Sequence, residues 1–377
     1  KMSKYSKLAI TGIFGMMVAG TCTIISSKLA LETSACPLFI SEEYSPIQEW
    51  EHGKCPKFLV KKFSKPCFLT GVVFCSNSCC LLAFYLVQLV KYCKKQHITR
   101  YPWRAYAWPC LSGLISVFAI TLLNTGMTFV DASISQMVRG SMIVFCSMFN
   151  VILLKRKLFT FQWIAVVGTV MAIVFVGLSS VLSSQFTKPW TEQLTGCAII
   201  IASTLLQGLY ITIQDFTVNK FHIDPLFLVG VEGVFGLVVN CALVWPVVQA
   251  IPGADHGSME YLMDSFYMVA DSARVLTFVL LYFFSLFLFN WSAMVVVQHA
   301  SSVVRSIFDS VRTAIIWLVN LMIFYVIAPQ SAYGERWTTF SWIQMAGFVL
   351  LVFSSQCYSG YVKFPTLFEY QRDNKAE

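Results

Sequence analysis

The chain has 377 residues, of which 57% are hydrophobic and 12% are charged, and its formal net charge at pH 7 is +8. Soluble domains carry about 25% charged residues, so this composition is typical of an integral membrane protein and leaves little chain for a soluble domain. A positive charge of this size favours nucleic-acid binding only in a soluble protein, so we expect no nucleic-acid partner.

Hydrophobic stretches of about twenty residues, each long enough to cross about 30 Å of hydrocarbon, occur ten times along the chain. They cover approximately 8–27, 68–90, 107–130, 133–154, 162–182, 195–216, 226–250, 274–297, 300–327 and 338–359. We therefore predict an all-α integral membrane fold with ten transmembrane helices. The first span is long enough to cross and lacks a small-residue cleavage pattern, so we expect it to be retained.

The positions of the basic residues predict the topology. Lysines and arginines precede the first span, separate the second from the third and follow the fourth. By the positive-inside rule these segments and both termini are cytoplasmic. The opposite side carries an acidic stretch with Asp255, Glu260 and Asp264, and also a long loop, 28–67, whose lysines obey the rule poorly.

Most of the 13 cysteines fall within predicted spans, where cysteine behaves as a small apolar residue. Cys36 and Cys55 lie in the non-cytoplasmic loop 28–67. A disulfide between them is expected if that side faces an oxidising lumen, and not otherwise. The adjacent Cys79 and Cys80 do not have metal-ligand spacing, and we expect no metal site.

The chain contains an internal duplication. The segment Phe161–Gly168 (FQWIAVVG) returns as Phe340–Gly347 (FSWIQMAG), and four further pairs of short motifs follow in register. Since each half has five spans, an odd number, the second half must enter the membrane upside down relative to the first. We predict two inverted five-helix repeats, 1–190 and 191–361, followed by a polar tail, 362–377.

Ionisable residues inside the spans are the main site candidates, because a charge in hydrocarbon is costly and usually faces the bundle interior. Arg305, Asp309 and Arg312 are spaced four and three residues apart, so they share one helical face. Arg139, with Gln136 one turn earlier, is the repeat counterpart of Arg312. These arginines either line the substrate path or merely tie helices together.

Glu232 lies among Gly230, Gly233 and Gly236, which allow neighbouring helices to approach closely. It has no charged neighbour in its own helix, so it either has a substrate-binding or proton-coupling role or forms a structural pair with a buried arginine. Glu232 and Asp309 are the only acids that we place within the spans, and they are the coupling candidates.

Several uncharged polar residues also lie within the spans, and each is either a substrate ligand or an interhelical hydrogen-bond partner. These are Asn124, Gln207, Tyr210, Gln214 and Asn290. No phosphate-binding loop, zinc-binding helix or nucleophile elbow is present. We therefore expect neither an enzyme nor a cofactor.

Several motifs resemble the drug/metabolite transporter superfamily and, within it, the solute carrier 35 family, subfamily F, member six group. In the first half they are Asn124, 132–140 and 155–158. In the second half they are Asp224-Pro225, 229–236, 251–253, Phe289-Asn290 and 308–313. The similarity covers essentially all ten spans, whereas the loop 28–67 departs from the pattern. The chloroquine-resistance transporters are more distant relatives.

The resemblance implies a five-plus-five helix fold that alternates between inward-open and outward-open forms. It implies secondary transport of a small organic metabolite, such as a nucleotide sugar, amino acid or peptide, by exchange or with protons. The excess of arginine over acid in the spans favours an anion. The alternative is a transporter-like structural subunit of a larger membrane complex.

The resemblance leaves other properties open. We expect a multi-pass protein of an intracellular membrane, either of the lysosome, vacuole or another endomembrane or of the mitochondrion. The partners expected are the lipid bilayer and a small-molecule substrate. The chain acts as a monomer or homodimer, or in association with a larger membrane complex.

Overall fold

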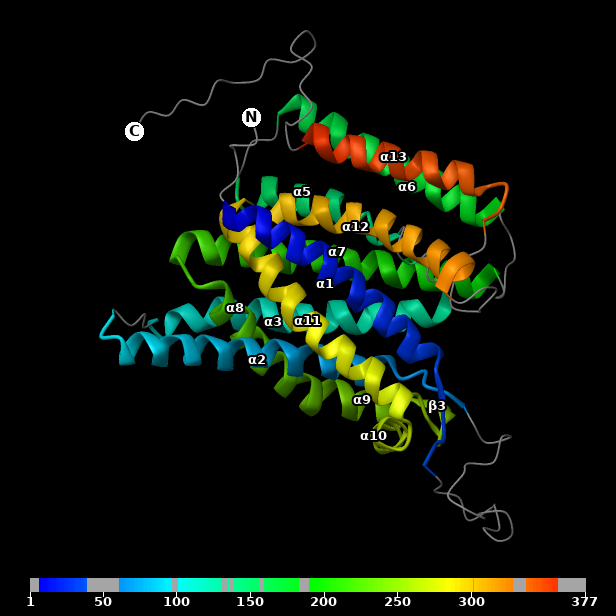
Figure 1. Ribbon diagram of the computed structural model, residues 1–377, viewed down its shortest axis with the longest axis horizontal. Coiled ribbons are helices and arrows are strands. Elements are labelled where there is room, and N and C mark those ends of the chain that lie inside the picture. Colours follow the sequence, from blue (N-terminus) through cyan, green and yellow to red (C-terminus); the bar gives the residue numbers. More distant parts are fainter. Residues whose placement is uncertain are drawn as a thin grey trace.

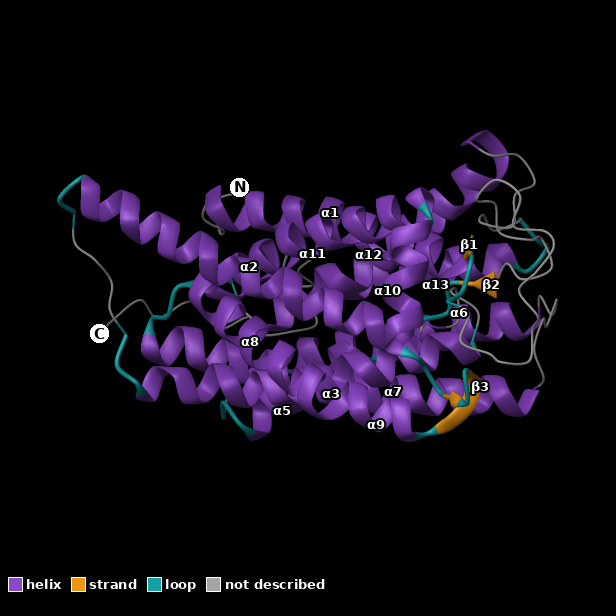
Figure 2. Cartoon of the chain, turned by 90° about the horizontal axis from the view of Figure 1, so that it is seen from below, coloured by secondary structure: helices purple, strands orange, loops and turns teal. Residues whose placement is uncertain are grey.

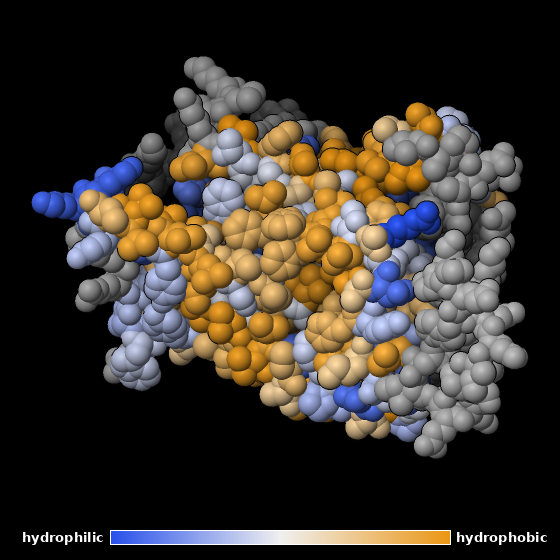
Figure 3. Space-filling view, turned by 60° about the horizontal axis from the view of Figure 1, so that its bottom comes forward, coloured by the Kyte–Doolittle hydropathy of each residue, from blue (hydrophilic) through white to orange (hydrophobic). Residues whose placement is uncertain are grey.

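The computed structural model of the protein describes residues 7–38, 61–96, 101–130, 135, 138–155, 159–182, 190–300, 302–327 and 337–358. These residues form a bundle of long helices that run roughly side by side, with three very short strands at one end (Figures 1 and 2). Hydrophobic residues cover the middle of the bundle surface, and hydrophilic residues gather toward its ends (Figure 3). This distribution fits a bundle surrounded by lipid.

The first part of the chain contributes α1 (Lys7–Glu32), β1 (Ser34–Ala35), β2 (Lys61–Lys62), α2 (Pro66–Cys93), α3 (Arg104–Phe129), α5 (Met142–Ile152) and α6 (Thr160–Leu182). The second part contributes α7 (Trp190–Phe221), α8 (Pro225–Val239), η1 (Asn240–Val244), α9 (Trp245–Ala250), β3 (Pro252–Asp255), α10 (Leu262–Asp271), α11 (Ala273–His299), α12 (Ser302–Met322), η2 (Ile323–Ile327) and α13 (Ser341–Tyr358). Strands β1 and β2 pair antiparallel.

Seven helical stretches in the described residues are long and apolar enough to cross a membrane. They begin at Leu8, Pro66, Ala105, Leu194, Pro225, Ala273 and Ser302. The other three predicted spans fall on α5, α6 and α13, of which α5 has only 11 residues. A multi-pass membrane protein is thus confirmed, while the count of ten spans remains a prediction.

Two local features differ from the predicted spans. The span 226–250 is one continuous helical rod with a π-helical turn, η1, in which the Trp245 N–H bonds to the Asn240 carbonyl. Pro246 follows at once and has no N–H to donate, which accounts for the irregular turn at this point. The segment 251–273, between two predicted spans, contains β3 and the amphipathic helix α10.

The helices pack in a pattern that repeats between the two parts of the chain. Helix α1 packs on α11 and α7 packs on α3, while α2 packs on α8, α5 on α12 and α6 on α13. The pairings are unchanged when each helix of the first part is exchanged for one of the second: α1 for α7, α2 for α8, α3 for α11, α5 for α12 and α6 for α13. Helices α6 and α13 form an outer layer at the top of Figure 1.

Helices α2 and α8 approach most closely where α8 carries glycine. A Cβ atom on Gly233 would overlap the backbone of α2 at Asn77 and Ser78. The sequence prediction that Gly230, Gly233 and Gly236 allow close helix contact is therefore confirmed. This contact also holds Glu232, which is 4% exposed, inside the bundle.

Candidate substrate site

Arg312 lies in the middle of the bundle. It is 2% exposed and follows Ser302, the first residue of α12, by about 15 Å of helix. Its Nη2 lies 2.6 Å from Asp309 Oδ1, and its guanidinium group sits over the Phe289 ring of α11 at 4.7 Å from the centroid. The predicted pairing of Asp309 with Arg312 along one helical face is present.

Helix α1 makes room for this arginine at Gly20. A Cβ atom at Gly20 would collide with the Nη1 and Cδ atoms of Arg312 and with the Phe289 ring. The side chain of Arg312 therefore fills the space that any larger residue on α1 would occupy. Helices α1, α11 and α12 thus fix its position together.

Arg139, which precedes α5, faces the same region from the first part of the chain. It is half-buried and lies within electrostatic range of Arg312, of Tyr210 on α7 and of Tyr282 on α11. No described acidic side chain lies within ion-pair distance of its guanidinium group. Two arginines, one from each part of the chain, therefore lie within electrostatic range of each other inside the bundle.

Tyr210 of α7 lies among several of these charged side chains. Arg305, Glu232, Asp309 and Arg139 all act on it electrostatically. Tyr210 itself is half-buried and packs against the cluster formed by α5 and α12. Four of the predicted site residues therefore lie within electrostatic range of a fifth, Tyr210.

A continuous chain of hydrogen bonds links Glu232 to Arg305. The Glu232 carboxylate accepts from the Ser112 hydroxyl of α3 and, at 2.7 Å, from Gln214 Nε2 of α7. The oxygen of the same Gln214 side chain accepts from Arg305 Nη1 at 2.8 Å, and Met294 Sδ lies 3.4 Å from that nitrogen. Glu232 is thus joined to an arginine through an amide, rather than by a direct ion pair.

Two of the other predicted polar residues, Asn124 and Asn290, make helix–helix contacts. Asn124 Nδ2 donates to the Thr70 hydroxyl of α2 at 2.7 Å, and Asn290 Nδ2 donates to Asn77 Oδ1 at 2.8 Å. Gln207 Nε2 donates to Ser203 on its own helix at 2.9 Å. Gln136 lies outside the described residues. These contacts favour the interhelical role for Asn124 and Asn290 among the two that the sequence leaves open.

The sequence analysis overlooked a third buried acid. Asp215 lies within the predicted span 195–216, so the statement that only Glu232 and Asp309 are intramembrane acids is wrong. It is 0% exposed and accepts from the backbone N–H of Ser302 at 3.0 Å and from its hydroxyl at 2.6 Å. Asn150 of α5 donates to the same hydroxyl at 3.0 Å. An acid inside an apolar helix was the available signal.

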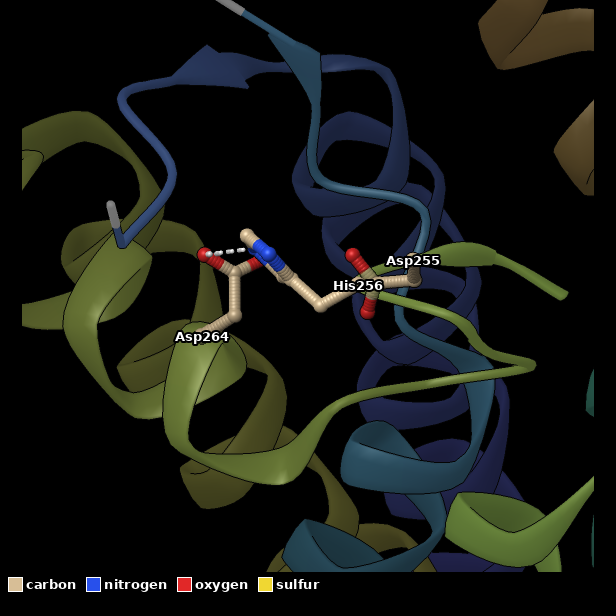
Figure 4. Close-up of side chains that lie close together, drawn as sticks. All are labelled: Asp255, His256 and Asp264. Atoms are coloured by element: carbon tan, nitrogen blue, oxygen red, sulfur yellow. Dashed lines mark ion pairs between the residues drawn. The ribbon is translucent and has the colours of Figure 1, made fainter. Parts of the chain in front are cut away.

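A second buried ionic cluster lies outside the spans, at the end of the bundle that carries the strands. Lys65 forms ion pairs with Asp255 of β3 and, at 2.6 Å, with Asp264 of α10. Asp264 also accepts from the Leu38 N–H, and His256 Nε2 lies 3.9 Å from Asp264 Oδ1. Figure 4 shows the His256 ring turned toward Asp264, with Asp255 on the same hairpin.

Ligand atoms of Asp255, His256 and Asp264 lie within 4.8 Å of one another, a spacing that a metal ion tolerates. Lys65 supplies the positive charge between the two carboxylates, so we assign no metal ion to the cluster. Cys36, in the same region, is disulfide-bonded. Cys55 lies outside the described residues, and the Cys36–Cys55 pairing remains a prediction.

Residues 54–178 match the EamA-like transporter family. Over 367 residues the chain is 27% identical to solute carrier family 35 member F6 of Homo sapiens, and the match covers 95% of this chain and 90% of the human protein. An uncharacterized protein of Schizosaccharomyces pombe is 27% identical over 268 residues, covering 70% of this chain and 77% of the yeast protein.

A solved crystal structure superposes with a TM-score of 0.55 and 12% identity, covering 95% of this chain and all of the other, which shows a shared fold. The family match and the relatives agree with the motifs quoted from the sequence. The chain is therefore a multi-pass membrane protein that is similar over residues 54–178 to the EamA-like transporter family and along nearly its whole length to solute carrier family 35 member F6.

Proposed function

We propose that the protein is a secondary active transporter, rather than an enzyme, and that it moves a small organic metabolite across an intracellular membrane by alternating access. One observation carries the proposal: charged side chains from both parts of the chain lie buried or half-buried inside the bundle, within electrostatic range of Tyr210. Burying so many charged groups in a membrane-spanning bundle costs free energy, so such groups usually have a function. A substrate that interacts with these groups would explain their position.

The proposed mechanism requires two inverted repeats that move against each other. The exchange pattern of helix contacts supports a duplication, and the five-span halves then give opposite orientations. In Figure 1, α1 begins and α13 ends at one end of the bundle, and β3 lies at the other. The positive-inside rule places the first of these ends in the cytoplasm.

Glu232 is the proposed coupling residue. Its carboxylate is buried and accepts from Ser112 of the first half and from Gln214 of the second, so it lies where the two halves touch. A conformational change that separates the halves alters its surroundings and therefore its affinity for a proton. Asp309 forms a direct ion pair with Arg312 of its own helix and is the weaker candidate.

The test is uptake into proteoliposomes under an imposed pH gradient. A metabolite pool serves first to find a transported solute, since the substrate is not fixed by these observations. Wild-type uptake should follow the gradient, whereas Glu232→Gln should lose that response and retain exchange of substrate.

Unchanged gradient dependence in Glu232→Gln would eliminate the coupling role. Absence of flux for any solute in the pool would reject transport itself. That result would favour the alternative, a structural subunit of a larger membrane complex.

A further inference from the structure

Helix α10 lies across the direction of the long helices. It belongs to the segment between α9, which ends at Ala250, and α11, which begins at Ala273. In Figure 1 the long helices run across the picture, whereas α10 is seen almost end-on at the lower edge of the bundle, beside β3. A helix that crosses the spans near their ends is oriented along the membrane surface rather than through the membrane.

The two faces of α10 are reversed relative to those of a surface helix in a water-soluble protein. Its buried face carries two polar side chains, Asp264 and Ser265, which are 1% and 0% exposed, beside the apolar Met268. Its outer face carries Met263 and Phe266, which are 59% and 49% exposed. A surface helix in water turns its polar residues outward, so the outer face of α10 is suited to apolar surroundings.

Contacts with other elements fix the rotation of α10 about its axis. Asp264 faces inward, where its carboxylate lies 2.6 Å from Lys65 Nζ. The Phe266 ring packs edge-on against the rings of Phe68 and Trp245, at centroid distances of 5.2 Å and 6.5 Å, and half of this residue stays exposed. The apolar side chains therefore remain on the outside for as long as these contacts are kept.

The outer face of α10 continues the apolar surface of the neighbouring spans. Val247 and Ile251, at the end of α9, are 50% and 42% exposed, and Leu276, near the start of α11, is 39% exposed. Lipid surrounds the spans to which α9 and α11 belong. Asp271 and Arg274, which are exposed and lie where α10 joins α11, suit the level of the lipid headgroups.

We propose that α10 lies in the interface of the leaflet at this end of the bundle, with Met263 and Phe266 inserted at the boundary between headgroups and acyl chains. The partner of this face is the bilayer, because any protein that covered it would also have to cover the adjoining lipid-facing spans. Through the ion pair of Asp264 with Lys65, which precedes α2, the anchored helix also holds the start of α2. The proposal does not depend on which solute is transported.

Photocrosslinking of the full chain in phosphatidylcholine nanodiscs tests the contact. p-Benzoylphenylalanine replaces Phe266 in one variant and Glu192, an exposed residue in the first turn of α7, in the control. The excited ketone takes a hydrogen atom from a nearby C–H group and the two carbon atoms join, so a lipid adduct has the mass of the chain plus one whole lipid. Intact-mass spectrometry should show several-fold more of this adduct for the Phe266 variant than for the control.

Substitutions at Met263 distinguish lipid from water by a second measurement, the apparent Tm in the same nanodiscs. Met263 lies in the first turn of α10, where in water an acid would be favoured by the helix dipole. In the interface, Met263→Asp should instead lower the apparent Tm by at least about 2 °C. Met263→Gln, which adds no charge beside Asp264, should also lower it, whereas Met263→Leu keeps an apolar side chain and should stay close to wild type.

The proposal is overturned if the Phe266 variant gives no more lipid adduct than the Glu192 control. Adducts between two chains in place of lipid adducts would also overturn it and would identify a second copy as the occupant of this face. An unchanged or raised apparent Tm in both Met263→Asp and Met263→Gln would show that the face lies in water.

Discussion

Glu260 Oε2 accepts a 2.8 Å hydrogen bond from the backbone N–H of Cys67, so a side chain that precedes α10 caps the first turn of α2. Glu260 Oε1 accepts from the next N–H, that of Phe68, at 2.7 Å. Helix α2 begins with Pro66, which has no N–H, so these are the first donors that the helix leaves unpaired. A loop of the second half therefore fixes the start of a helix of the first half.

Titration of Glu260 should contribute to the pH dependence of the stability of the fold. Burial raises the pKa of Glu260 to about 7, although the two backbone N–H groups and Lys65 oppose the shift. Because the folded chain binds this proton more tightly than the unfolded chain, Glu260 stabilises the fold at acidic pH. The contribution is lost as pH rises from about 4.5 to about 7, and it amounts to at most about 3 kcal/mol.

The glutamine side chain in Glu260→Gln does not titrate, so the variant should lack the loss of stability that Glu260 causes between about pH 4.5 and pH 7. Apparent Tm measured in detergent from pH 5 to pH 8 checks the expectation. Glu192→Gln, at an exposed position in the first turn of α7, is the control and should keep the wild-type profile. Identical profiles for wild type and Glu260→Gln would disprove the assignment.

Replacing Lys65 should destabilise the fold, because its buried acidic partners then lack a cation. Lys65→Met leaves Asp264, whose side chain is 2% exposed, without its cation, and breaking a buried pair in this way costs about 3–5 kcal/mol. The apparent Tm should fall steeply. Adding Asp264→Asn should recover part of the loss, since the uncompensated charge is then removed. Additive losses in the double variant would show that the two residues are not coupled.

Gly20→Ala should displace the Arg312 side chain without changing its charge. The added methyl group overlaps the guanidinium group and the Phe289 ring, so the arginine must move and substrate uptake should fall by at least about tenfold. Gly12→Ala, on the same helix, meets its nearest neighbours at 3.2–3.3 Å and should be much milder. Uptake assays on both variants at equal protein level make the comparison, and equal activity would argue against Arg312 in the substrate path.

Ser302→Ala should weaken the contact between α5, α7 and α12. The hydroxyl joins Asp215 and Asn150, and its loss leaves buried polar groups unsatisfied at a cost of about 1–3 kcal/mol. Thr277→Ala removes an exposed hydroxyl that bonds only within α11 and should be close to neutral. The difference in apparent Tm between the two variants measures how much the hydrogen bonds of Ser302 stabilise the fold. An unchanged apparent Tm for Ser302→Ala would show that water replaces the hydroxyl.

Hydrophobic run lengths determined from the sequence that the chain crosses a membrane many times, because about 30 Å of hydrocarbon demands continuous apolar segments whatever the packing. The repeated FQWIAVVG-type motif likewise reported a duplication before any helix was placed. An acid such as Glu232 inside an apolar span was recognisable as buried and polar from sequence alone. These inferences depend only on local composition and on solvent.

The partners of those residues were decided by the tertiary structure. Lys65 and Asp264 are 199 positions apart, and Ser112 and Glu232 are 120 apart. Each buried polar group had to find a partner, but hydropathy does not state which helices are neighbours or how each is rotated about its axis. The same missing information hid the role of Asp215 and of the Glu260 cap. Contacts between side chains of different helices are fixed by close packing, such as that of Gly20 against Arg312. This packing exists only in the folded chain.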